Sequence, residues 1–203
     1  MAKQCVHYRL LNDRLLELSE KFVNDQVVNE NNDPAGFKPD IDRLAAYRLL
    51  IHAEIEDFLE QKAKENLDLI GSRISAAGPW VRQFPELLSV AMVLKKWPPL
   101  SNQLDSHIFS KFIGELVCTG RTAIKDNNGV KTASFMLLSI LSGKTIEEID
   151  SVLGAGLNSY GKQRGDVAHK SVTRTNSLLA PSAELNAAKD LVTEIGTYFD
   201  VCV

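Results

Sequence analysis

An arginine and a histidine stand five positions apart in the segment YGKQRGDVAHKS, residues 160–171. They are Arg164 and His169, with Asp166 between them and Lys170 directly after. Histidine titrates near neutral pH and can both accept and donate a proton, whereas arginine stays charged and grips phosphate through its fork of N–H donors. Together these residue types suit chemistry at a phosphodiester.

The apolar pattern before this segment predicts a helix whose buried stripe leads into Arg164. The residues of that stripe, at helical spacing, are Ile149, Leu153, Leu157 and Tyr160. An arginine at the next inward position must be paired, or must face a surface that another molecule covers, because an unpaired buried charge is very costly. His169 lies roughly 140° further around an ideal helix. We therefore expect the long arginine side chain to span that angle, or the helix to end near His169.

Glycines are unusually frequent in the same predicted helix, at positions 154, 156, 161 and 165. Each weakens a helix interior by up to about 1 kcal/mol relative to alanine. Their presence indicates close packing of a neighbouring backbone against the helix.

The segment RGDVAH resembles the R-x4-H motif of HEPN domains, the higher eukaryotes and prokaryotes nucleotide-binding superfamily. AAYRLLIHAEIEDFLEQ at 45–61 is similar to an early helix of that family, and the run from 127 to 171 resembles the approach to the motif in its RiboL-PSP-HEPN branch. The resemblance covers about residues 40–200. It implies a helical bundle that dimerises about a two-fold axis and, in many members, a ribonuclease that needs no metal or other cofactor.

The resemblance also implies roles for individual residues. Arg164 and His169 of both subunits would form one catalytic site, with Asp166 and Lys170 binding substrate or supporting the pair. The products would be a 2′,3′-cyclic phosphate and a 5′-hydroxyl, and DNA would resist cleavage because it lacks the 2′-hydroxyl. RNA, a second copy of the chain, and an antitoxin or regulatory protein are the implied partners, in a toxin or defence effector.

One position departs from the family pattern. Many active relatives carry a polar residue directly after the arginine, where this chain has Gly165. Two alternatives to catalysis therefore stay open: a HEPN dimerisation module that binds nucleotide, RNA or a partner protein without cutting, and a helical adapter whose only role is to dimerise.

Composition supports a cytoplasmic, water-soluble chain. The 203 residues are 44% hydrophobic and 24% charged, with a net charge of −3, so that nucleic-acid binding would need a local basic patch such as residues 160–174. The longest nearly apolar run, at 87–94, is far shorter than the roughly 20 residues that span a bilayer. Three widely separated cysteines predict reduced thiols and no disulfide framework.

Other candidate groups favour ordinary structural roles. His52 and Glu56 stand one helical turn apart without a second pair, which favours a surface pair over a metal site. His7 and His107 lack partners at useful spacing, and core packing is the expectation for Trp80 and Trp97. The string SGKT at 142–145 is a turn between helices.

We expect an all-α fold, an antiparallel helical bundle of HEPN type with extra helices, in one domain over residues 1–203. Residues 1–39 would form an N-terminal helix and loop, and 40–203 the bundle core. No alternating strand pattern is present. The predicted helices cover 5–28, 40–67, 86–97, 105–125 and 131–141, then a helix that begins at the Thr145/Glu148 capping box, and a last helix from Ser182 as N-cap to Phe199.

Overall fold

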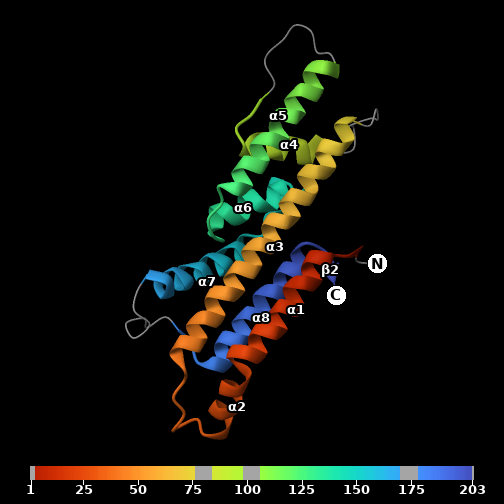
Figure 1. The fold of residues 1–203 in the computed structure, drawn as a ribbon. Coiled ribbons are helices and arrows are strands. Elements are labelled where there is room, and N and C mark those ends of the chain that lie inside the picture. Colours follow the sequence, from red (N-terminus) through yellow and green to blue (C-terminus); the bar gives the residue numbers. More distant parts are fainter. Residues whose placement is uncertain (1–2, 76–83, 98–105, 170–177, 203) are drawn as a thin grey trace. The chain divides into compact units, whose positions relative to one another are not determined.

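The computed structural model describes residues 3–75, 84–97, 106–169 and 178–202, and within these ranges the fold is all-α, as predicted (Figure 1). The helices are α1 (Val6–Phe22), α2 (Asn24–Asn32), α3 (Ile41–Ser75), α4 (Phe84–Val93), α5 (Ser106–Lys125), α6 (Thr132–Leu141), the 3₁₀ turn η2 (Ile146–Glu148), α7 (Ser151–His169) and α8 (Pro181–Tyr198). No helix in the described ranges combines the length and apolar character needed to cross a membrane.

The chain divides into two compact units. Unit 1 contains Met1–Phe58, Gly129–Thr132 and Asp150–Val203, and unit 2 contains Leu59–Asn128 and Ala133–Ile149. Helix α3 therefore contributes its first half to unit 1 and its second half to unit 2.

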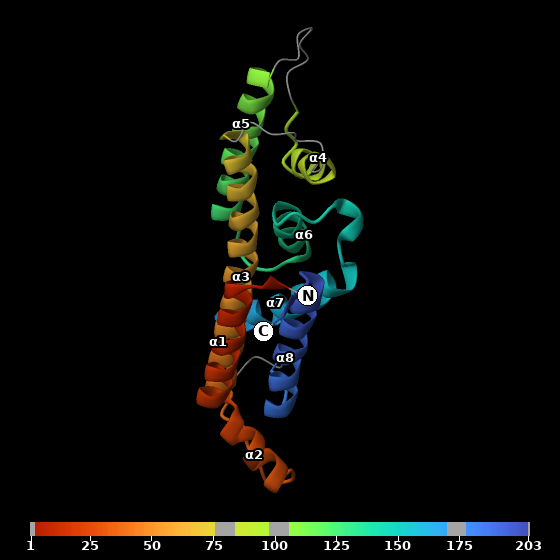
Figure 2. The ribbon, with the colours of Figure 1, turned by 90° about the vertical axis from the view of Figure 1, so that its right-hand side faces the viewer.

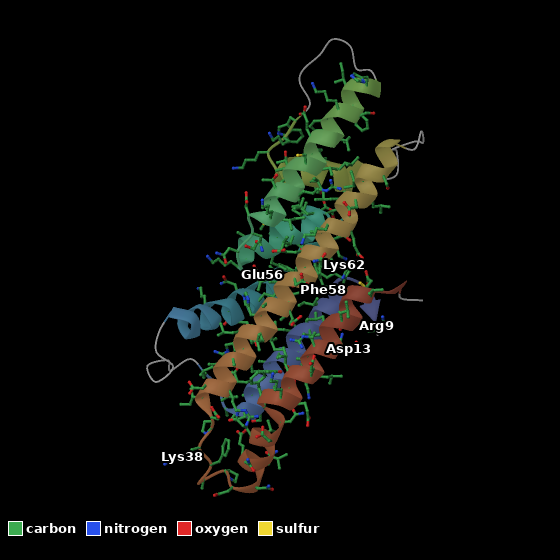
Figure 3. The ribbon with its side chains drawn as sticks, viewed as in Figure 1. Arg9, Asp13, Lys38, Glu56, Phe58 and Lys62 are labelled. Carbon is green, nitrogen blue, oxygen red and sulfur yellow. The ribbon has the colours of Figure 1, made fainter. Side chains whose placement is uncertain are left out.

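In unit 1, α1 and α8 lie side by side (Figures 1 and 2). Tyr8 of α1 donates a hydrogen bond from its hydroxyl to the Val192 carbonyl of α8, at 3.1 Å. Its ring packs edge-on against Phe58 of α3, which is labelled in Figure 3. Two-residue strands, β1 (Lys3–Gln4) and β2 (Val201–Cys202), pair in parallel next to these helices. This short pairing has no alternating pattern in the sequence and was not predicted.

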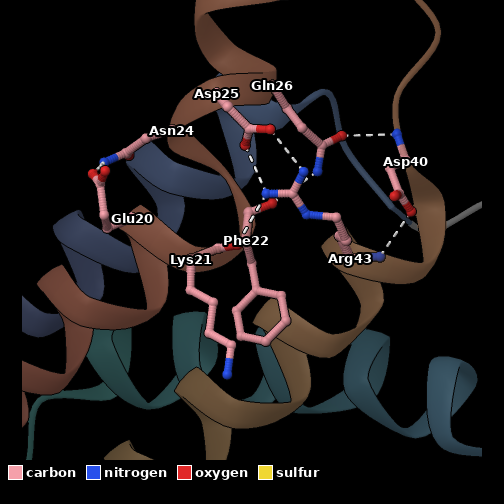
Figure 4. Close-up of polar contacts among 8 residues, drawn as sticks. All are labelled: Glu20, Lys21, Phe22, Asn24, Asp25, Gln26, Asp40 and Arg43. Atoms are coloured by element: carbon pink, nitrogen blue, oxygen red, sulfur yellow. Dashed lines mark hydrogen bonds and ion pairs between the residues drawn. The ribbon is translucent and has the colours of Figure 1, made fainter.

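The prediction of one continuous helix over 5–28 is wrong, because the helix is interrupted at Val23, between α1 and α2. Val23 is fully buried, with φ −129° and ψ −39° outside the helical region. Arg43 of α3 donates to the Lys21 carbonyl and, in a bidentate pair, to Asp25, with all three distances at 2.7–2.9 Å (Figure 4). Side-chain donors thus satisfy carbonyls at the end of α1, where a helix lacks its own partners.

The start and the buried stripe of α3 follow the prediction. The Asp40 carboxylate accepts a hydrogen bond from the Arg43 backbone N–H at 3.1 Å, which makes Asp40 the N-cap. The predicted stripe residues are all at most 2% exposed: Leu44, Arg48, Ile51, Ile55 and Phe58.

Unit 2 contains α4, α5 and α6 packed with the second half of α3. Of the stripe predicted for α5, Ile108, Phe112, Leu116 and Ala123, only Leu116 is buried, and Ile113 and Ile124 are buried in place of Phe112 and Ala123. The true face includes Gly120, which lies against Leu67 and has no side chain to mark it in the sequence. Helix α6 and the turn after it, where Gly143 has φ +96°, agree with the prediction.

The prediction that Trp97 packs in a core is wrong. Trp97 is 59% exposed and lies beyond the end of α4, after the chain turns at Lys95 with φ +53°. Trp80 lies outside the described residues.

The starts of the last two helices also differ from the prediction. The Thr145/Glu148 capping box forms, but it caps the start of η2 and not the start of α7. Asp150 instead caps α7, accepting from the Val152 and Leu153 amides at 2.9 and 3.0 Å. Helix α8 begins at Pro181, a residue suited to the first helical turn. The hydroxyl of Ser182, the predicted N-cap, contacts Glu30 instead.

Candidate functional site

Helix α7 carries most of the predicted catalytic segment. It runs without interruption from Ser151 to His169, the last residue described before the gap at 170–177, so Arg164, Asp166 and His169 are helical. Which of the two arrangements expected from the 140° separation forms lies outside the described residues. The side chains of residues 163–169, and Lys170 as a whole, lie outside the described part of the structure.

The stripe that leads into Arg164 is buried as predicted from Leu153 onward. Leu153, Leu157 and Tyr160 are at most 5% exposed, and Ile149 is half-buried. The N-terminal half of α7 is thus fixed in the core of unit 1, one helical turn before position 164.

A buried ion pair lies beside Tyr160. Arg48 of α3 donates to both carboxylate oxygens of Glu184 in α8, from Nε to Oε2 at 3.1 Å and from Nη2 to Oε1, and both side chains are fully buried. The Arg48 guanidinium carbon lies 5.8 Å from the centre of the Tyr160 ring, a distance at which a cation is attracted to an aromatic face. Glu184 also accepts a hydrogen bond from the Leu179 amide at 2.7 Å. One acidic side chain therefore joins α3, α8 and the chain that enters α8.

Burial sets the protonation of the neighbouring phenols. It raises the pKa of Tyr160 well above the ordinary value of a tyrosine, and it raises the pKa of Tyr47 to about 12, although a hydrogen bond with Ser19 at 3.1 Å opposes the rise. Burial also raises the pKa of Glu184, and Arg48 and the Leu179 amide counter that rise. Both phenols, which like any tyrosine are neutral at physiological pH, therefore stay neutral to a higher pH than an exposed tyrosine does.

His52 does not form the predicted surface pair with Glu56. Its side chain is only 1% exposed, and Nδ1 lies 3.8 Å from the Glu56 carboxylate. A methyl group added at Gly161 of α7 would lie 3.2 Å from His52 Nε2, and one at Gly129 would lie 3.8 Å from Cε1. Glu56, labelled in Figure 3, accepts a hydrogen bond from the Gly129 amide. The nearest neighbour of position 161 is therefore the His52 side chain, and the expected backbone contact is the Val130 carbonyl, 3.9 Å from the added methyl group.

The remaining histidines lie at the surface. His107 is exposed on α5. His7 borders a solvent-open hollow of about 250 Å³, whose other lining residues are Leu10, Leu11, Glu54, Asp57 and Phe58. Arg14 Nε donates a hydrogen bond to the Glu54 carboxylate of this hollow at 2.9 Å. Among the residues that the structure describes, no group of three or more His, Cys, Asp or Glu side chains could hold a metal ion.

Arg48 and Glu184 were missed as a pair by sequence reasoning. Arg48 falls on the apolar stripe of α3, and that charge at a core position was the available signal. Its partner lies 136 positions away in the chain. No sequence spacing could have indicated it.

Comparison of the chain with protein-family models, with curated proteins and with solved structures gives no match.

Proposed function

We propose that the protein is a metal-independent endoribonuclease of the HEPN type. In this proposal two copies of the chain meet so that Arg164 and His169 of each surround one phosphodiester. One histidine accepts the proton of the ribose 2′-hydroxyl, and the histidine of the partner subunit donates a proton to the leaving 5′-oxygen. The two arginines stabilise the charge that builds on the phosphoryl oxygens.

The observation that carries the proposal is the position of the motif on α7. The helix is anchored through Leu153, Leu157 and Tyr160 and then continues without a break to His169. A site built on a helix that is packed at its base holds its reacting groups more precisely than a site on a loop.

The same segment supplies the charge that an RNA substrate needs. Residues 160–174 contain four basic residues and one acidic residue within a chain of net charge −3. Local positive charge can attract the phosphate backbone even where the net charge is negative. Asp166 and Lys170 complete the proposed site, as supports of the catalytic pair or as contacts to RNA.

The biological setting is proposed from the resemblance alone. A ribonuclease of this type acts as a toxin or defence effector in the cytoplasm, and its activity is restrained by an antitoxin or another regulatory protein.

The test is cleavage of end-labelled RNA in the presence of EDTA. We expect wild-type protein to cut RNA and leave 2′,3′-cyclic phosphate ends, and we expect His169→Ala and Arg164→Ala to stop cutting. His107→Ala and Arg9→Ala are matched controls, because both side chains are exposed outside the proposed site. These controls should cut at the wild-type rate.

Light scattering over a concentration series accompanies the cleavage assay, since the composite site requires a dimer. Cutting by a folded His169→Ala dimer would reject the catalytic assignment. Dimers that bind RNA but never cut it would replace the proposal with the non-catalytic interaction module.

A further inference from the structure

We infer that the buried Arg48–Glu184 ion pair is a positioning device for the segment that carries Arg164 and His169. The pair binds one group before this segment and one group after it. Before it, the Tyr160 ring lies 5.8 Å from the Arg48 guanidinium carbon. After it, the Leu179 amide donates to Glu184 at 2.7 Å.

These two attachments bracket residues 161–178. Tyr160 and Leu179 are 19 positions apart in the sequence, yet each contacts one member of the same ion pair. Both ends of the bracketed segment therefore contact the same buried ion pair of unit 1, Tyr160 through its ring and Leu179 through its backbone amide. Every residue of the predicted site, Arg164, Asp166, His169 and Lys170, falls within the bracket.

The energetics favour positioning over stabilisation as the role of the pair. Both side chains are fully buried, and removing two charges from water costs several kcal/mol per ion, which their mutual attraction only partly returns. Apolar residues of similar volume would fill the space equally well or better. They would not attract the Tyr160 ring as a cation does, and they would not accept the Leu179 hydrogen bond.

The catalytic part of this inference rests on the proposed function. If α7 carries the catalytic pair, a small displacement of its C-terminal half should slow the chemical step without removing the basic residues that bind RNA. A misplacement of 1 Å can cost about 100-fold in rate. We therefore expect loss of the ion pair to lower kcat by about 100-fold and to change KM little.

The experiment compares two double variants. Arg48→Met with Glu184→Met replaces the buried pair by apolar side chains, which can preserve the fold. Arg14→Met with Glu54→Met is the matched control, because that ion pair also belongs to unit 1 and joins α1 to α3. Tyr160→Phe is a second control that keeps the ring over Arg48 and removes only a hydroxyl with no hydrogen-bond partner among the described residues.

Two readouts separate this inference from the proposed function. The first is hydrogen exchange of the backbone amides in 161–179, which requires no activity. We expect exchange there to be about tenfold faster in the Arg48/Glu184 variant and unchanged in both controls. The second readout is the kinetics of RNA cleavage, with kcat and KM determined separately.

Faster exchange in a protein that never cuts RNA would leave the positioning role standing and reject the proposed function. Unchanged exchange and unchanged kcat in the folded Arg48/Glu184 variant would overturn the positioning role. Should that variant fail to fold, Tyr160→Leu decides the question, because it keeps the buried ion pair and removes the aromatic ring that the Arg48 guanidinium attracts. The same exchange and kcat criteria apply to Tyr160→Leu.

Discussion

The two halves of α3 bury different kinds of side chain. Among the side chains described in the unit 2 half, residues 59–72, those that are buried are all apolar: Leu59, Ala63, Leu67 and Ile70. The half in unit 1 buries Arg48 and His52 among its apolar residues, both at most 1% exposed. One helix thus combines an ordinary apolar seam with a seam that contains charge and hydrogen-bonding groups.

The difference indicates where the molecule requires a unique arrangement. Apolar side chains can exchange places and slide at modest cost, whereas a buried charge tolerates only the geometry that pairs it. In unit 1 that geometry fixes α3 against α8 and the N-terminal half of α7. Unit 2 pairs its charges at the surface, as in Arg121–Asp68, whose side chains are 59% and 63% exposed.

The largest expected effect comes from breaking the buried pair on one side. Arg48→Met leaves Glu184 without its partner in the core, and such a loss costs about 3 to 5 kcal/mol in the free energy of unfolding. Urea denaturation followed by circular dichroism measures the change. Arg121→Met is the matched control in unit 2, and it should cost less than about 1 kcal/mol because its pair is screened by solvent. Equal losses in the two variants would remove the distinction between the two halves of α3.

The second prediction uses the tyrosines, all four of which belong to unit 1. Burial raises the pKa of Tyr47 from an ordinary value near 10 to about 12, and that of Tyr160 further. A phenol with a raised pKa in the folded state contributes stability that is present below pH 10 and is lost as the pH rises from 10 towards 12. For Tyr47 the loss amounts to about 2 to 3 kcal/mol.

Urea midpoints at pH 9 and pH 11.5 measure this alkaline loss, and absorbance at 295 nm follows the ionisation itself. The double variant Tyr47→Phe with Tyr160→Phe should flatten the pH dependence in this window. Hydrogen exchange resolved by segment should locate the loss in unit 1. A loss of the same size in the double variant, or one that begins in unit 2, would contradict the prediction.

The third prediction compares two helical glycines. A methyl group at Gly161 would lie 3.2 Å from His52 Nε2, and His52 has little room to retreat because its side chain is only 1% exposed. Gly161→Ala should therefore destabilise unit 1 by about 1 to 2 kcal/mol, despite the better helix propensity of alanine. At Gly114 of α5 nothing lies within 4 Å of the added group, so Gly114→Ala should stabilise unit 2 by up to about 1 kcal/mol. Thermal unfolding of both variants measures whether each substitution raises or lowers stability. Stabilisation by Gly161→Ala would show that His52 can move.

The sequence predicted those parts of the fold that depend on local pattern. Helical spacing placed the buried stripe of α3 from Leu44 to Phe58, and it placed the stripe of α7 up to Tyr160. Asp40 marked the start of α3 and Gly143 marked the end of α6, because one residue of the right type is enough to cap a helix at each of these places. The Arg-x4-His pair was placed on a helix by the same reasoning, and α7 does contain both positions.

Features that depend on partners distant in the sequence were not predictable. Arg43, which donates to the Lys21 carbonyl next to the break at Val23, lies 20 positions after that break, and Arg48 is buried with Glu184 as its partner. His52 was read as a surface residue because nothing local shows that Gly129 and Gly161 make room for it. In each of these cases a polar group is satisfied by a tertiary contact, which spacing along one element does not encode.

The smallest expected effect concerns exposed carboxylates, which should behave alike in the two units. The Arg43 guanidinium holds the pKa of Asp25 below its usual value in unit 1, and the Thr145 amide does the same for Glu148 in unit 2. A carboxyl with a lowered pKa in the folded state contributes stability that is present above the unfolded pKa and is lost as the pH falls through the folded value. Each loss should stay below about 1 kcal/mol because solvent screens both sites.

Urea midpoints at pH 6 and pH 3 measure this acid loss of stability. We expect Asp25→Asn to reduce it in unit 1 and Glu148→Gln to reduce it in unit 2. A several-fold larger effect of Asp25→Asn would mean that the break between α1 and α2 depends on this ion pair more than its exposure implies, and the contrast between the units would then extend to their surfaces.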